Sequence, residues 1–330
     1  MPIFDIVVVG GVLFGLGTFI TFARQGHKVP VLEASPSLQI VGDAIACIAN
    51  HARVLEGWGL LDRFRQVAPR DLGIMHHRCF SNAEISLVKT WTIFLPRLDI
   101  PSYILSRQGY QQFLYDEAVK LGVIVSLNNR VGKVDDNQDQ PEITLTDGSR
   151  HQADLIVGRD ECTSQTNCYR AVLTREQVAQ DPDLKEFTET MNFWMAPNRL
   201  IIQSVMAGIG SVAINLYHPG HGGTAGSWKS SGDVNQMRED AAHAMAPYVE
   251  QGCAVVMEDV ATLAECVARV KATNDLPQLL RTCEDIRRPR SELISRTAAI
   301  VGKIWQIPDG PGQERHDERM RQAPLYSAAS

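Results

Sequence analysis

The sequence lacks the features that mark a metal protein, a nucleic-acid-binding protein or a membrane-spanning protein. Its seven cysteines include no CxxC pair, which argues against a metal site and indicates reduced thiols in a cytoplasmic protein. The formal net charge of −6 gives no electrostatic basis for binding nucleic acid. We expect no stable membrane insertion, because Asp5 and several glycines interrupt the apolar N-terminal stretch. We find no internal repeat and no low-complexity segment.

The most informative segment present is the first 33 residues. Residues 5–9 predict a buried strand, residues 10–15 a glycine turn, residues 16–25 a helix and residues 28–32 a second strand, after which Glu33 follows. This is the layout of a dinucleotide-binding βαβ unit. The chain has 330 residues and is 44% apolar, so it is long enough for about two globular domains.

The glycine turn departs from the usual G-x-G-x-x-G pattern at one position. Gly10 and Gly15 keep the tight turn and the close contact of helix and strand, but Val12 stands where the middle glycine is expected. The Val12 side chain would project where a pyrophosphate passes. Glu33 is placed to accept hydrogen bonds from a ribose diol. An ordinary α/β crossover that binds nothing remains an alternative for this segment.

Hydrophobic periodicity predicts further elements along the chain. We expect helices at residues 50–67, 107–121, 258–271 and 276–300, with Arg287–Arg290 interrupting the last, and strands at residues 123–127, 131–134, 142–146, 154–158, 199–206 and 211–216. The polar stretch from Pro308 is expected to fray.

Separated motifs together resemble one family. Residues 42–45 match a turn beside a flavin, Ser106–Arg107 a cofactor-contacting arginine, residues 154–160 a "D-L-V-V-G-A-D-G" segment, and residues 240–252 a second FAD motif. About residues 4–320 resemble the FAD-dependent aromatic monooxygenases of the salicylate hydroxylase and para-hydroxybenzoate hydroxylase type, also called class A flavoprotein monooxygenases, in their fungal form.

The resemblance implies an α/β fold, with a Rossmann-like FAD-binding domain, an inserted and shortened β-rich substrate domain, and C-terminal helices. The implied division assigns residues 1–72 and 106–173 to FAD binding, 73–105 and 174–237 to the substrate layer, and 238–330 to the second FAD motif and helices. It also implies FAD and NAD(P)H as cofactors, and O2 and a phenolic or related aromatic small molecule as substrates, in a fungal secondary-metabolite pathway.

The resemblance also implies a set of site residues. The residues implied to bind the cofactor are Gly10, Gly15, Glu33, Gly42, Ala44, Arg107, Asp160, Asp240, Gly252 and Cys253, and a catalytic role falls on Arg170. Alternatives remain open for individual residues. Arg107 could begin a helix in a surface salt bridge, Asp240 could cap a helix, and His243 is expected to be a packed histidine rather than a base.

The chain departs from the family pattern in its substrate domain. Ser204 stands where some members carry a tyrosine, and Glu239 stands where a glycine is usual. A helix and several strands expected before Met237 are missing. We therefore expect weak or uncoupled hydroxylation. The alternatives are a flavin-binding reductase or oxidase, and a degenerate member without catalysis.

Overall fold

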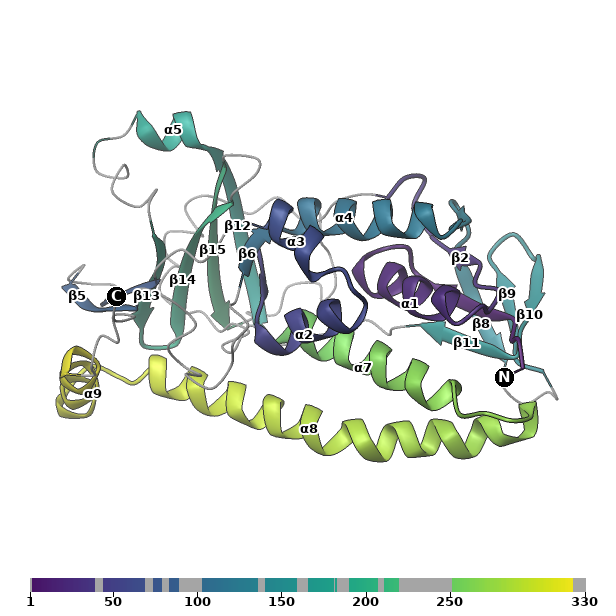
Figure 1. Ribbon diagram of the computed structural model, residues 1–330. Coiled ribbons are helices and arrows are strands. Elements are labelled where there is room, and N and C mark those ends of the chain that lie inside the picture. The colour runs from purple at the N-terminus through teal and green to yellow at the C-terminus, as the bar shows by residue number, and fades with distance from the viewer. Residues whose placement is uncertain are drawn as a thin grey trace.

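The computed structural model describes residues 2–38, 44–68, 74–78, 83–88, 103–135, 140–158, 166–180, 182, 190–206, 211–219 and 251–322. Two β-layers lie toward opposite ends of the molecule, and helices run along and between them (Figure 1). The predicted βαβ unit belongs to one layer and the predicted substrate-domain strands to the other.

The first layer is a four-stranded parallel sheet in the order β11-β1-β2-β7. Its strands are β1 (Ile6–Val9), β2 (Val31–Leu32), β7 (Val125–Ser126) and β11 (Leu155–Gly158). Helix α1 (Leu13–Arg24) connects β1 to β2, as the sequence predicts. Because the strands are parallel, Gly10 after β1 and Glu33 after β2 lie at the same edge of the sheet.

Apolar packing on both faces explains why β1 is apolar throughout. Ile6 and Val8 belong to the large core under α1 and α4 (Arg107–Lys120), whereas Val7 belongs to a smaller core on the other face. That second face is covered by an antiparallel sheet of β8 (Val131–Asp135), β9 (Glu142–Leu145) and β10 (Arg150–Gln152). A strand covered on both sides has no polar face to present.

The second layer is a six-stranded sheet in the order β12-β15-β14-β13-β4-β5. Its strands are β4 (Ile74–Arg78), β5 (Ala83–Val88), β12 (Thr166–Thr174), β13 (Met191–Ala196), β14 (Arg199–Met206) and β15 (Ser211–Pro219), and the short helix α5 (Arg175–Ala179) follows β12. Neighbouring strands are antiparallel except β4 and β13. β12 pairs with β15 here, although residues 106–173 are expected in the first domain; the domain division itself stays a prediction.

A two-stranded antiparallel ribbon, β3 (Ala44–Cys47) and β6 (Tyr103–Ser106), contacts β14 of the second layer and contributes Cys47, Tyr103 and Leu105 to the first core. After β3 the predicted single helix over residues 50–67 is wrong. The chain forms α2 (Ala49–Gly57) and α3 (Leu61–Val67) instead. Gly59 adopts a φ of +67° between them, a left-handed conformation that ends a helix and that glycine adopts without strain.

Three helices complete the described chain: α7 (Gly252–Val267), α8 (Leu276–Trp305) and α9 (Pro311–Gln322), with a short 3₁₀ turn at Thr273–Asp275 before α8. The start of α8 packs in the first core through Leu276. Its end packs in the second layer, where the Trp305 and Phe193 rings lie 5.4 Å apart. In Figure 1, α8 runs along the length of the molecule from one layer to the other.

Two expectations for this region are wrong. The segment Arg287–Arg290 does not interrupt α8, which continues through Pro289. Proline removes its own backbone donor and crowds the carbonyl of Asp285, but Asp285 is exposed, so water can reach that carbonyl. The stretch after Pro308 is ordered through Gln322. It forms α9, which begins at Pro311 and packs Met320 on the second layer.

Candidate functional site

The glycine turn after β1 requires glycine at two positions. Gly10 has a φ of +99°, and its N–H donates to the Leu32 carbonyl at 2.7 Å. A Cβ on Gly15 would lie 1.7 Å from the Gly10 carbonyl oxygen, so a side chain at this position would force α1 away from the turn. These two glycines therefore bring the amino end of α1 against the carboxyl end of β1, the arrangement that dinucleotide-binding units use.

Glu33 is folded back onto this turn. The side chain is buried, and one carboxylate oxygen accepts the Gly11 N–H at 2.6 Å while the other accepts the Ser35 N–H at 2.8 Å. A Cβ on Gly11 would lie 3.2 Å from the Glu33 Cβ and 2.9 Å from a Leu38 methyl carbon, so Gly11 also keeps this contact close. The sequence analysis did not count Gly11 as a site residue. Each carboxylate oxygen has a second lone pair for a further donor.

Val12 occupies the N-cap position of α1. Its backbone is extended, its carbonyl accepts the first helical N–H from Leu16 at 2.9 Å, and its side chain is 37% exposed. Val12 has no side-chain acceptor, so the N-cap residue leaves the first N–H groups of α1 without a capping hydrogen bond. An uncapped helix start beside a glycine turn is a site for an anion such as a pyrophosphate.

A second group of predicted residues meets around the β3–β6 ribbon. Ala44 pairs with Ser106, and Ser106 caps α4 by accepting the Gly109 N–H at 2.9 Å. Arg107 is the first residue of α4, and its charge acts on Cys253 in the first turn of α7. The structure therefore brings Ala44, Arg107 and Cys253 together, with Gly252 at the start of α7.

α1, α4 and α7 pack side by side, and their amino ends all point toward the middle of the molecule (Figure 1). A Cβ on Gly17 of α1 would lie 3.1 Å from the end of the Met257 side chain on α7, so these two helices approach closely. Three helix amino ends, one glycine turn and one arginine create a region suited to a ligand that carries phosphates.

Several predicted residues fall outside the described residues. Gly42, Asp160, Asp240 and His243 are in this group, so their roles stay predictions. The backbone of Arg170 lies in β12 opposite Asn215, but its side chain is outside the described part.

A polar network that the sequence analysis missed holds the start of α7 against α2 and α8. Asn50 donates to Gln251 at 3.0 Å and to Glu258 at 2.7 Å, and Glu258 also accepts from Arg287 and Arg290. Burial would raise the pKa of Glu258, but hydrogen bonds from Arg290, Asn50 and Arg287 outweigh it and lower the pKa. The sequence analysis noted the segment Arg287–Arg290, but not that Arg287 and Arg290 share Glu258 as a partner.

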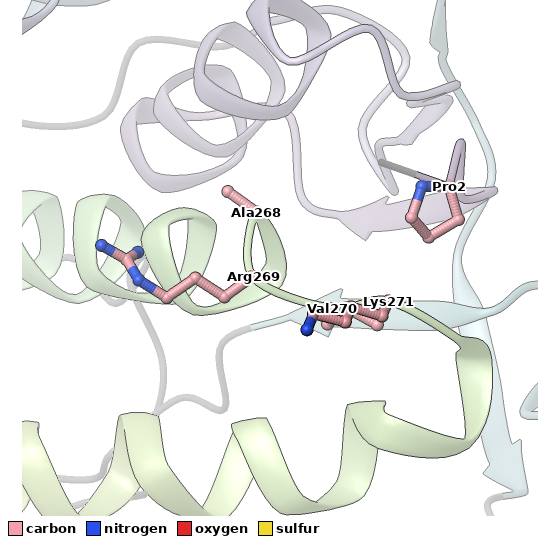
Figure 2. Close-up of a pocket in the computed structure, with 5 residues that line it drawn as sticks. All are labelled: Pro2, Ala268, Arg269, Val270 and Lys271. Atoms are coloured by element: carbon pink, nitrogen blue, oxygen red, sulfur yellow. The ribbon is translucent and has the colours of Figure 1, made fainter.

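An open pocket of about 540 Å³ lies elsewhere, lined by Pro2, Ala268, Arg269, Val270 and Lys271 (Figure 2). Pro2 precedes β1, so this pocket is at the amino end of the parallel strands, whereas Gly10 and Glu33 are at the carboxyl end. It is not the candidate site. Among the residues that the structure describes, no cluster of His, Cys, Asp and Glu could hold a metal ion, and no helix could span a membrane.

The fold and this site define a dinucleotide-binding α/β protein with a second, largely antiparallel sheet. No family model matches the chain. Its curated relatives include the FAD-dependent monooxygenase OpS4 of Beauveria bassiana, with 24% identity over 96% of this chain and 88% of the relative. They also include the 3-amino-4-hydroxybenzoate 2-monooxygenase of Streptomyces cremeus, with 26% identity over 96% of this chain and 91% of the relative.

Solved structures share the fold. The crystal structure of CtdE in complex with FAD and a substrate superposes with a TM-score of 0.81 and 18% identity, over 98% of this chain and 94% of that one. The chain is thus similar in sequence and fold to class A flavoprotein monooxygenases. The predicted resemblance to this family and the predicted α/β fold class are both confirmed.

The alignments also show that this chain is shorter than its relatives. The OpS4 alignment extends over 380 positions, whereas 96% of 330 residues is about 317, so about 63 positions of the alignment have no residue of this chain. The Streptomyces alignment of 373 positions gives about 56 by the same comparison. The expectation that the loss falls before Met237 stays a prediction.

Proposed function

We propose that this chain is an FAD-dependent monooxygenase-like oxidoreductase that uses NAD(P)H and O2 on a phenolic or related aromatic small molecule. The observation that carries the proposal is the glycine turn between β1 and α1. There the Gly11 N–H donates to Glu33, which follows β2, beside a helix start whose N-cap residue Val12 makes no side-chain cap. The relatives support the enzyme class and the cofactor, since one is a FAD-dependent monooxygenase and another a monooxygenase of an aminohydroxybenzoate.

The residues present fit FAD. A Cβ at Gly11 or Gly15 would meet its neighbours at 2.9 Å and 1.7 Å, so the turn keeps a narrow backbone cradle that a pyrophosphate can approach. Glu33 would accept from the adenosine ribose through its remaining lone pairs. Arg107 would offer its guanidinium to the polar linker of the cofactor.

The other end of the cofactor would lie near the start of α7. There the backbone N–H groups of Gly252 and Cys253 would face the flavin ring, which becomes electron-rich on reduction. Asp240 would accept from the ribityl chain, and Asp160 and Gly42 would complete the cradle. When bound, FAD reduced by NAD(P)H supplies the oxygen-activating chemistry. The protein's contribution is to orient the aromatic ring and to exclude water.

We propose further that oxygen transfer is poorly coupled in this chain. The relatives have about 60 positions that this chain lacks, and Ser204 is buried in β14 where some family members carry a tyrosine. A pocket open to water loses reducing equivalents. In that case NAD(P)H, a proton and O2 yield NAD(P)⁺ and hydrogen peroxide. A reductase or oxidase without hydroxylation is the alternative.

The visible spectrum of the purified chain tests cofactor binding. We expect the wild-type chain to carry bound flavin. Glu33→Ala should weaken flavin affinity about tenfold or more, because a hydrogen bond to a charged group contributes about 1.5–3 kcal/mol. Glu33→Gln separates charge from fold, since it keeps the side-chain volume. Asp5→Ala removes an acid at the opposite edge of the same sheet and is the matched control. Arg107→Ala is compared with Arg53→Ala, an exposed arginine on α2.

Unchanged flavin affinity in both Glu33→Ala and Arg107→Ala would show that these residues do not form the FAD site. NADPH consumption, peroxide and hydroxylated product, measured together over a panel of phenols, test the chemistry. Tightly coupled product with little peroxide would show that the missing positions are dispensable. Peroxide with no product from any phenol would favour the oxidase alternative, and no flavin at all a degenerate member.

The setting of the reaction is part of the proposal. The fungal FAD-dependent monooxygenase among the relatives supports a fungal secondary-metabolite pathway. Free cysteines at positions 47, 253, 266 and 283 support a reducing compartment such as the cytoplasm. Fluorescent tagging of the chain in its source cells would test the location.

A further inference from the structure

Two cysteines meet where β3 ends and α7 begins. Cys47 is the last residue of β3 and is buried, and Cys253 is the second residue of α7 and is half-buried. Their side chains share a hydrogen bond. The proposed function uses only the backbone N–H of Cys253, so neither sulfur atom has a role in it.

Three side chains from two other helices surround this pair. Tyr110 and Arg107 belong to α4, and His51 belongs to α2. Burial, and then the charges of Cys253 and Cys47, raise the pKa of Tyr110 well above its usual value, so it stays a phenol. Its hydroxyl shares a hydrogen bond with Nε2 of His51, with 2.5 Å between the two atoms.

The pKa values of the two thiols are consequently shifted in opposite directions. The hydrogen bond from Cys47 lowers the pKa of Cys253 to about 5, with the charge and hydrogen bond of His51 and the charge of Arg107 acting in the same sense against burial. The first turn of a helix also favours a thiolate. Burial, and then Cys253, raise the pKa of Cys47 well above its usual value, so it stays a thiol.

We propose that Cys47 and Cys253 form a peroxide-sensitive dithiol, in which Cys253 attacks the peroxide and Cys47 resolves the product. The Cys253 thiolate forms a bond to one oxygen of hydrogen peroxide, the O–O bond breaks, and the departing hydroxide takes a proton to become water. Cys47 sulfur then attacks the sulfenic sulfur of Cys253, the S–O bond breaks, and the thiol proton leaves with the hydroxyl as a second water. Two electrons pass from the dithiol to the peroxide.

The described chain contains a matched control pair. Cys266 of α7 is buried and Cys283 of α8 is half-buried, and they too share a hydrogen bond. Burial and then Cys266 raise the pKa of Cys283 to about 11. Each pair thus joins one buried and one half-buried cysteine through a hydrogen bond, and the pairs differ in the charge around the half-buried sulfur.

The test adds hydrogen peroxide in small excess to the purified full chain, blocks remaining thiols and maps the peptides by mass spectrometry. We expect a Cys47–Cys253 disulfide well before a Cys266–Cys283 disulfide. Cys47→Ser should leave a sulfenic acid on Cys253 that dimedone traps, and Cys253→Ser should abolish oxidation of Cys47. Equal oxidation of both pairs, or a Cys253 disulfide to another cysteine, would overturn the proposal. Because the peroxide is added, this test does not depend on whether FAD binds.

A second measurement does not depend on any variant folding. Iodoacetamide labelling is followed at each cysteine across pH. At pH 7 we expect Cys253 to react about tenfold or more faster than Cys283, because its larger thiolate fraction outweighs the lower nucleophilicity of a low-pKa thiolate. A rate at Cys253 that rises only above pH 8 would refute the assigned thiolate.

Discussion

The contact between Gly15 and the Gly10 carbonyl makes a strong prediction for fold stability. In Gly15→Ala the new Cβ would lie 1.7 Å from that oxygen, whereas an ordinary C···O contact is about 3.3 Å or more. The turn and α1 must therefore separate by about 1.5 Å, a change that backbone atoms on both sides resist. Gly17→Ala is the matched control, because its Cβ comes closest to the flexible end of Met257, at 3.1 Å, and lies at an ordinary 3.7 Å from Trp58.

Both variants gain about 1 kcal/mol of helix propensity, so their difference isolates the contact. Overpacking costs about 1–3 kcal/mol and more where backbone must move. We expect Gly15→Ala to be destabilised by about 3 kcal/mol and to melt about 6–12 °C below Gly17→Ala. Thermal unfolding followed by circular dichroism, in the absence of flavin, measures this. Melting temperatures of the two variants within about 2 °C of each other would show that the turn adapts easily and that the close approach of α1 is not enforced by Gly15.

Two further predictions concern the same helix starts. Val12→Gly should tighten FAD while lowering the free energy of unfolding by only about 0.5–1 kcal/mol, and a flavin titration that finds no tighter binding would refute the steric argument for Val12. In Glu258→Gln the free energy of unfolding should fall less between neutral and acid pH than in the wild type. A depressed carboxyl pKa stabilises the fold above the unfolded pKa of about 4.3, and this stability is lost as pH falls through the folded pKa. Denaturant unfolding at pH 7 and at pH 3.5 should show the wild type losing more stability than the variant, and equal losses would contradict the role of the network.

Local patterns were sufficient to predict the parallel layer. β1 could be placed because both of its faces are covered, which leaves a short β-branched run, and Gly10 and Gly15 followed from a turn that only glycine permits. The helix break at Gly59 was missed because the apolar period continues across it into Leu61. The interruption expected at Pro289 did not occur, because the Asp285 carbonyl that loses its helical partner is exposed and can bond to water instead.

The candidate site was predictable only in part, and for a different reason. Glu33 and Arg107 stand at element boundaries that sequence patterns mark. Cys47, His51 and Cys253 form one cluster, yet no spacing rule connects residues from opposite ends of the chain. Their arrangement depends on how α7 packs against β3 and α2, and this packing is a property of the tertiary structure.

Because α8 is one unbroken helix, it fixes the distance between the two layers. Thirty residues at 1.5 Å each give a rigid bar about 45 Å long, fixed in the first core at Leu276 and against Phe193 at Trp305. Leu276 and Trp305 lie on nearly the same face of the helix, because the 29 residues between these positions make about eight full turns. A single residue inserted between them would turn the Trp305 ring by about 100° around the helix axis and advance it by only about 1.5 Å. The chain can therefore change the sequence of α8 freely on its exposed side, but it can change the length only in steps that return Trp305 to the same face.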